Sequence, residues 1–186
     1  MKTDIVTYWK ESVNTQGNDN SPERYLTFKD RSLFLDDVFK EFVFKSDSIL
    51  ELGCNSGRNL IHLQELGYKN LSGVDINPNA IEMCPKYLKL FCEPIETFVE
   101  KMDNYNVIFT MATFQHLPEA SSFIFPIIAQ KTEMLITVED ELSVGDYHIG
   151  RNYQDVFERL GMKQIKLYEE VKGQTKDFKG RVFKHG

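Results

Sequence analysis

Two glycines and one acid stand at spacings that suit a bound nucleotide. Glu51, Gly53 and Gly57 share one short stretch, and Asp75 lies 75 − 57 = 18 residues beyond Gly57. Glycine allows positive φ angles and close approach of backbone to a ligand. An acid about twenty residues after such a turn can accept hydrogen bonds from ribose hydroxyls. The spacing therefore predicts a nucleotide-like ligand.

The glycine pattern narrows the ligand class. A dinucleotide fingerprint would place glycines at 53, 55 and 58, but Asn55 and Arg58 occupy two of these positions. Asn55 tolerates the left-handed conformation that such a turn needs. The pattern disfavours a nicotinamide or flavin dinucleotide.

The elements that must position these residues alternate along the chain. Short apolar runs are separated by segments of helical periodicity, which predicts βαβ units and a mostly parallel sheet. Strands are expected near 48–52, 71–75, 88–92, 105–110 and 133–138, and helices near 57–66, 78–84, 94–101 and 119–130.

The two ends of the chain differ from this alternation. Apolar residues at helical spacing predict a short N-terminal helix within 1–13, then a polar segment over 14–22 and further helix to about 42. At the other end, a helix near 153–160 precedes strands at 162–170 and 178–184, with a turn at 172–174 between them. A short link makes those strands antiparallel. We expect one domain over 1–186, with an N-terminal helix and lid segment at 1–22 and a core at 23–186.

Length and composition limit the class of protein and the kinds of partner. The chain has 186 residues, 41% of them hydrophobic and 27% charged, with a formal net charge of −6. These values are typical of a globular protein, and the acidic balance makes a nucleic-acid partner unlikely. No apolar run approaches the ~20 residues of a membrane span, so we expect a cytoplasmic protein without membrane contact. The three cysteines show no metal-ligand spacing, and no metal site is predicted.

At this point the sequence resembles the class I S-adenosylmethionine-dependent methyltransferases. The segment Glu51-Leu52-Gly53-Cys54-Asn55-Ser56-Gly57-Arg58-Asn59-Leu60 is similar to their first motif, 74–77 to their second, and 107–118 to their fourth. The resemblance covers about residues 22–184. It implies an α/β fold, a Rossmann-like seven-stranded mostly parallel sheet with helices on both faces and a C-terminal antiparallel hairpin. It also implies S-adenosyl-L-methionine as cofactor.

The resemblance assigns cofactor contacts residue by residue. The first-motif residues match the loop that holds the methionine part, Asp75 the ribose-binding acid and Ile76 an apolar contact beside the adenine. Pro94 replaces an acid often found there, and Ile95 offers a backbone N–H. Residues at the end of the fourth strand should line the gap between cofactor and acceptor. The predicted cofactor-binding residues are Glu51, Gly53, Cys54, Asn55, Gly57, Asp75, Ile76, Ile95, Thr110 and Met111.

Catalytic and acceptor-binding candidates are fewer. His116 lies just beyond the fourth strand and is the candidate general base, with capping or packing as the alternative. In this fold class an N-terminal segment often covers the cofactor, and loops after the fifth strand often contact the acceptor. The predicted substrate-binding residues are therefore Tyr8, Trp9, Arg24, Tyr25, His148 and Arg151. Glu139, Asp140 and Glu141 are interpreted as solvated loop acids, and the alternatives are that they bind a cationic amine or accept a proton.

These observations predict in-line methyl transfer to oxygen or nitrogen of a small molecule or a glycan sugar. Alternatives are a protein or RNA methyltransferase, or a non-catalytic S-adenosylmethionine-binding protein. The chain has no Asn-Pro-Pro-Tyr run after the fourth strand, which argues against nucleobase or glutamine amides as acceptors. The acceptor's identity and the oligomeric state are left open.

Overall fold

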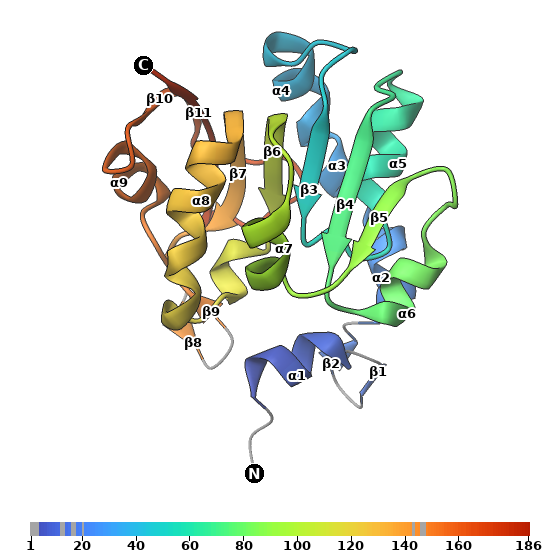
Figure 1. Ribbon diagram of the computed structural model, residues 1–186. Helices are drawn as coiled ribbons and strands as arrows, with labels where there is room; N and C mark the ends of the chain where they lie inside the picture. Colours follow the sequence, from blue (N-terminus) through green and yellow to red (C-terminus); the bar gives the residue numbers. More distant parts are fainter. Residues whose placement is uncertain (1–3, 12–13, 16–17, 20, 143, 146–147) are drawn as a thin grey trace.

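The computed structural model describes residues 4–11, 14–15, 18–19, 21–142, 144–145 and 148–186. Its centre is a seven-stranded sheet in the order β10-β11-β7-β6-β3-β4-β5 (Figure 1). The strands of this sheet are β3 (Ile49–Leu52), β4 (Leu71–Asp75), β5 (Lys89–Cys92), β6 (Tyr105–Met111), β7 (Thr132–Asp140), β10 (Met162–Tyr168) and β11 (Phe178–His185). The pairs formed among β3 to β7 are parallel, whereas β11 runs antiparallel to both β7 and β10. The predicted fold class and its closing hairpin are confirmed.

Helices cover both faces of the sheet because successive strand residues point in opposite directions. Ile49 faces a core built with α4 and α5, whereas Leu50 faces a core built with α7, α8 and α9. The helices are α1 (Ile5–Lys10), α2 (Pro22–Thr27), α3 (Lys29–Ser32), α4 (Phe34–Phe42), α5 (Arg58–Glu65), α6 (Pro78–Met83), α7 (Ile95–Lys101), α8 (Ile124–Lys131) and α9 (Tyr153–Glu158), with short 3₁₀ turns η1 (Phe114–His116) and η2 (Glu119–Phe123).

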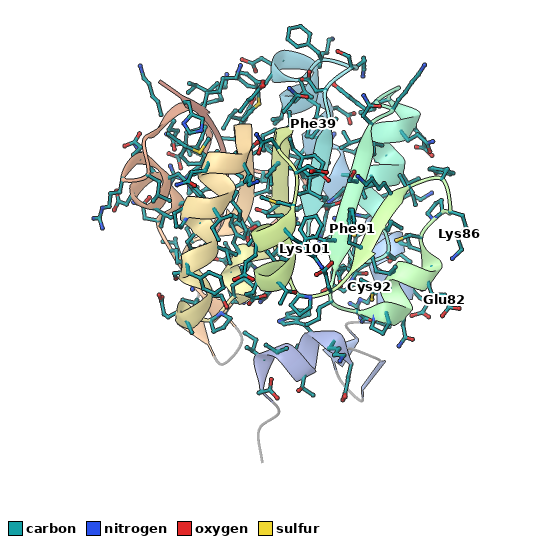
Figure 2. The ribbon with its side chains drawn as sticks, in the orientation of Figure 1. Phe39, Glu82, Lys86, Phe91, Cys92 and Lys101 are labelled. Atoms are coloured by element: carbon teal, nitrogen blue, oxygen red, sulfur yellow. The ribbon has the colours of Figure 1, made fainter. Side chains whose placement is uncertain are left out.

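Local sequence explains these helices. In α4 the apolar residues Phe34, Leu35, Val38 and Phe39 fall on one buried face. Phe39 is fully buried, and its ring lies edge-on to Phe109 of β6 at 5.4 Å between centroids (Figure 2). Aromatic pairs in this geometry add to the stability gained from burial.

Strand β5 forms one edge of the sheet, and two short strand pairs lie outside the sheet. Figure 2 shows Phe91 and Cys92 on β5, the terminal strand at one side. Two further antiparallel pairs of two-residue strands lie outside the sheet: β1 (Asn14–Thr15) with β2 (Asn18–Asp19), and β8 (Val144–Gly145) with β9 (His148–Ile149). Within the residues described, no helix is long and apolar enough to cross a membrane.

The parallel strands deliver their carboxyl ends to one edge. Leu52, Asp75 and Met111 end β3, β4 and β6, and these three strands are neighbours in the sheet. Helix α1 lies across that edge (Figure 1). Loops after these strands and the helix α1 therefore surround the place where parallel α/β sheets bind ligands.

Candidate active site

Three residues of the loop between β3 and α5 adopt the left-handed backbone conformation. Gly53, Asn55 and Gly57 have φ angles of 76°, 46° and 78°. Asn55 thus adopts the conformation expected of it. The Gly53 N–H donates to the Val74 carbonyl at 2.8 Å, which ties the loop to β4. A Cβ at Gly53 would lie 2.3 Å from the Thr113 hydroxyl oxygen, so this position requires glycine for space as well as for φ.

Asp75 is held at the end of β4 by backbone donors. Its Oδ2 accepts from the Asn55 N–H at 2.8 Å, and its Oδ1 accepts from the Asn77 N–H at 2.9 Å. Burial raises the pKa of the Asp75 carboxyl, while these N–H groups oppose that rise. Each oxygen of an ionised carboxylate can accept a second hydrogen bond. The Asp75 carboxylate is therefore oriented and can accept two ligand hydroxyls.

Glu51, in β3 just before the loop, is buried at 2% exposure. Its Oε1 accepts from Asn59 Nδ2 at 2.6 Å, while Oε2 has no partner among the described residues. The Asn59 carbonyl in turn accepts from Ser32 Oγ at 2.7 Å and from Arg58 Nη2 at 3.2 Å. Burial raises the pKa of Glu51 to about 8, against the opposing effects of the Asn59 hydrogen bond and the Arg58 charge. A cationic group beside Oε2 would favour the ionised form.

A cavity brings these groups together at the carboxyl edge of the sheet. The volume of the cavity that water can occupy is about 140 Å³. This is roughly ten times the smallest volume that holds one water molecule. The predicted site residues that line it are Trp9, Tyr25, Glu51, Gly53, Cys54, Asn55, Asp75, Ile76, Ile95, Met111 and His116.

Two predicted cofactor-binding residues lie behind the cavity wall. Gly57 is buried, and a Cβ there would approach Cys84 Sγ to 3.1 Å, so its small size lets α5 begin against Cys84. Thr110 is fully buried inside β6, one residue before Met111, which does line the cavity. Side chains alternate along a strand, and this alternation turns Thr110 away.

Tyr8 and Arg24 also lie outside the cavity lining. Tyr8 packs its ring edge-on to Trp9 at 5.0 Å. Arg24 is exposed, and its guanidinium lies over the Phe28 ring at 5.5 Å. Trp9 and Tyr25, one from each of the same two helices, are the aromatic residues that reach the cavity.

His148 and Arg151 contact the loop after β6 but do not line the cavity. The ring of His148 lies 4.7 Å from that of His116. Arg151 is 9% exposed and donates to the Phe114 carbonyl at 3.0 Å and to the Leu117 carbonyl at 2.7 Å. Arg151 therefore braces the segment that carries His116.

The acids at the end of β7 are buried. Glu139 is fully buried and accepts from the backbone N–H groups of Thr113 at 3.0 Å and Gln115 at 3.2 Å. Burial raises its pKa to about 7. Glu141 pairs with Arg181, with Oε2 and Nη2 2.7 Å apart. The interpretation as solvated loop acids is wrong, because these groups hold the post-β6 loop and β11 in place.

Several cavity residues had no assigned role in the sequence reasoning. Arg58 and Asn59 belong to the motif already singled out, so their position was a usable signal. Gln174 comes from the β10–β11 turn, and its Nε2 is buried without a partner in the described part of the chain. The turn that carries Gln174 packs closely on α3, since a Cβ at the neighbouring Gly173 would lie 2.9 Å from the Arg31 backbone. This contact between distant segments brings Gln174 to the site, and no local sequence pattern indicates it. Ala112, just after β6, lines the cavity, and the sequence had placed it at the gap between cofactor and acceptor. The remaining unassigned lining residues are Ile5, Val6, Arg31, Ser56, Pro94, Glu96, Thr113, Leu117 and Pro118.

The sequence from 25 to 141 matches the family described as the methyltransferase domain. The chain belongs to this family. The match spans the glycine loop, Asp75 and the post-β6 segment, so it covers the main walls of the cavity. A search of curated proteins finds no match.

Solved structures share the fold at low identity. A TehB-like SAM-dependent methyltransferase from Corynebacterium glutamicum is 17% identical, with a TM-score of 0.64, over 91% of this chain and 90% of that one. Magnesium protoporphyrin IX methyltransferase from Synechocystis with bound SAM is 13% identical, with a TM-score of 0.67, over 98% and 96%. The complex of a Haloferax volcanii methyltransferase activator with its methyltransferase partner gives 11% identity and a TM-score of 0.69 over 99% and 98%. The protein is thus a methyltransferase by family, and it has the fold of these S-adenosylmethionine-dependent enzymes.

Proposed function

We propose that this methyltransferase transfers a methyl group in line to a heteroatom of a small molecule or glycan sugar enclosed beneath α1. Bound S-adenosylmethionine supplies a methyl group made electrophilic by its sulfonium. The protein's task is to align the acceptor and exclude water. The observation that carries the proposal is the pair of oriented acids, Glu51 and Asp75, lining one cavity beside the glycine loop.

The cavity residues suit the chemical groups of the methyl donor. The Asp75 carboxylate would accept from the two ribose hydroxyls, and Ile76 and Ile95 would offer apolar contact to the adenine; the support is that all three line the cavity and that backbone N–H groups orient Asp75. The methionine end carries an ammonium and a carboxylate. Among the described residues neither Glu51 Oε2 nor Gln174 Nε2 has a partner; the first suits the ammonium and the second suits the carboxylate. A buried acceptor and a buried donor left without partners are costly unless a ligand pairs with them.

Helix α1 supplies the outer wall. Ile5, Val6 and Trp9 line the cavity from a helix that crosses the open edge of the sheet. We propose that α1 acts as a lid over both substrates. Such a cover favours a small acceptor or a terminal sugar over a folded protein or an RNA helix.

Isothermal titration with S-adenosylmethionine tests the cofactor assignment. The wild type should bind, and Asp75→Asn should lose about 100-fold in affinity because the acceptor loses its charge and one of its two oxygens becomes an NH₂ donor. Asp103→Asn, at an exposed position, is the matched control. A methyl-transfer assay over small-molecule, glycan, peptide and RNA acceptors then separates the alternatives. Binding without turnover on any of them would favour the non-catalytic alternative, and absence of binding would refute the proposal.

A further inference from the structure

The short helix α3 brings a cation to the cavity wall. Arg31 lines the cavity, and its guanidinium carbon lies 4.3 Å from the centre of the Phe28 ring. Attraction between the guanidinium and the face of the ring orients the side chain without neutralising its charge. The next residue, Ser32, is buried and donates to Asn59 Oδ1 at 2.7 Å, which fixes α3 against the start of α5. Arg31 is therefore held in place at the cavity.

The charge of Arg31 acts on two other groups of the cavity wall. Burial raises the pKa of the Tyr25 phenol, and the Arg31 charge opposes that rise. Burial lowers the pKa of Arg58; the Glu51 carboxylate opposes this change, and the Arg31 charge adds to it. Tyr25, Arg58 and Glu51 all line the cavity. Two arginines thus lie near each other at one end of the cavity, beside Glu51.

The two arginines differ in their hydrogen bonds. The Arg58 guanidinium donates to Ser32 Oγ at 3.1 Å and to Asn59 Oδ1 at 3.2 Å, so it stabilises the start of α5. Within the residues described, the Arg31 side chain has neither a hydrogen bond nor an ion pair. A guanidinium carries five N–H donors in a fixed plane. Those of Arg31 are available to a ligand.

A second donor comes to the same end of the cavity from the β10–β11 turn. A Cβ at Gly173 would lie 2.9 Å from both the nitrogen and the Cα of Arg31, so this turn contacts α3 directly. The next residue, Gln174, lines the cavity, and its buried Nε2 has no partner in the described part of the chain. An anion between Arg31 and Gln174 would satisfy both side chains.

The charges of the cavity favour an anion at this end. Burial raises the pKa of Glu51 to about 8, so at pH 7 this carboxyl is mostly protonated before a ligand binds and does not neutralise the two arginines. The other acids of the wall have different partners. Asp75 accepts from backbone N–H groups, and Glu96 accepts from Ser121 Oγ at 2.6 Å.

We propose that Arg31 and Gln174 bind the carboxylate of the methionine end, and that Arg31 makes the enzyme selective for methyl donors that carry this carboxylate. The inference rests on the proposed function and assigns a specificity-determining residue for its donor. A guanidinium can donate two parallel N–H groups to the two oxygens of a carboxylate. With Glu51 on the ammonium, this end of the cavity recognises the zwitterion of an α-amino acid. A donor without the carboxylate leaves Arg31 without an anion.

Isothermal titration at pH 7 with S-adenosylmethionine and with decarboxylated S-adenosylmethionine tests the assignment, because the two ligands differ only in the carboxylate. The wild type should bind the decarboxylated form about 100-fold more weakly. Arg31→Met keeps an apolar stem for Phe28 and removes the charge. It should weaken S-adenosylmethionine binding about 30-fold and leave the Kd of the decarboxylated form within about twofold of wild type. Arg31→Lys should lose about tenfold, since an ammonium lacks the paired N–H groups.

Lys29→Met is the matched control, because it removes one positive charge from an exposed position of the same helix. It should bind both ligands as the wild type does. The unchanged Kd of the decarboxylated form in Arg31→Met also checks that the cavity is intact. Equal weakening of both ligands in Arg31→Met, unchanged affinity for S-adenosylmethionine, or an equal loss in Lys29→Met would overturn the assignment. Failure of the wild type to bind either ligand would instead refute the proposed function.

Discussion

Proton-linked binding at Glu51 is the most quantitative expectation. Burial raises the pKa of this carboxyl to about 8, so at pH 7 about a tenth of it is ionised. The ammonium of S-adenosylmethionine requires the carboxylate form. Binding should therefore release a proton, and ionising Glu51 at pH 7 costs about 1.4 kcal/mol, one pKa unit.

The consequence is a steep pH dependence of affinity. Between pH 5.5 and 6.5 the Kd should fall about tenfold, since one proton leaves on binding. Above about pH 7.5 the ligand's own α-amino group begins to titrate, so the test belongs below that value. Glu51→Gln keeps an acceptor for Asn59 but cannot ionise, and its Kd should be flat over the same range.

Calorimetric titration in two buffers of different ionisation enthalpy measures the released proton directly. The wild type should release close to one proton per site at pH 6, and Glu51→Gln none. Glu100→Gln, on the exposed side of α7, should behave as the wild type. A flat wild-type Kd with no proton release, or an unchanged slope in Glu51→Gln, would refute the role given to this carboxylate.

Three further expectations follow. Gly53→Ala should lose more stability than Gly67→Ala in urea unfolding, because both have positive φ but only the Gly53 Cβ meets a neighbour, Thr113; equal losses would contradict this reasoning. Burial raises the pKa of Glu139 to about 7, so its contribution to stability is complete below pH ~4.5 and is lost as pH rises through 7. Between pH 6 and 8 the free energy of unfolding of the ligand-free wild type should fall by about 1 kcal/mol more than that of Glu139→Gln. An equal fall in both proteins would refute this expectation. Gln174→Leu should weaken S-adenosylhomocysteine binding about fivefold with kcat unchanged at saturation, and unaltered affinity would remove Gln174 from the site.

Sequence patterns predicted the strands of the sheet and the part of the site that comes from one continuous segment, Glu51 to Leu60. Alternation of apolar runs predicted β3 to β7 within about two residues, because buried parallel strands read as short hydrophobic segments. The motif from Glu51 to Leu60 marked the cavity wall, because a turn that must take positive φ restricts its own residue types. Gly53 shows this most clearly.

The rest depended on contacts between distant segments. No local pattern distinguishes Gln174, which reaches the cavity because its turn packs on α3. Arginine is a residue type that often binds substrates, but the partners of Arg151 are carbonyls of another loop. The acids at the end of β7 were expected to be exposed because acids usually are, whereas Glu139 is buried and accepts from two backbone N–H groups.

A co-crystal structure with S-adenosylmethionine tests the central claim most directly. The account predicts the ribose hydroxyls on Asp75, the ammonium beside Glu51 and the methyl group facing the wall formed by Trp9 and His116. A ligand bound elsewhere, or one seated in this cavity with its methionine end away from Glu51, would contradict it.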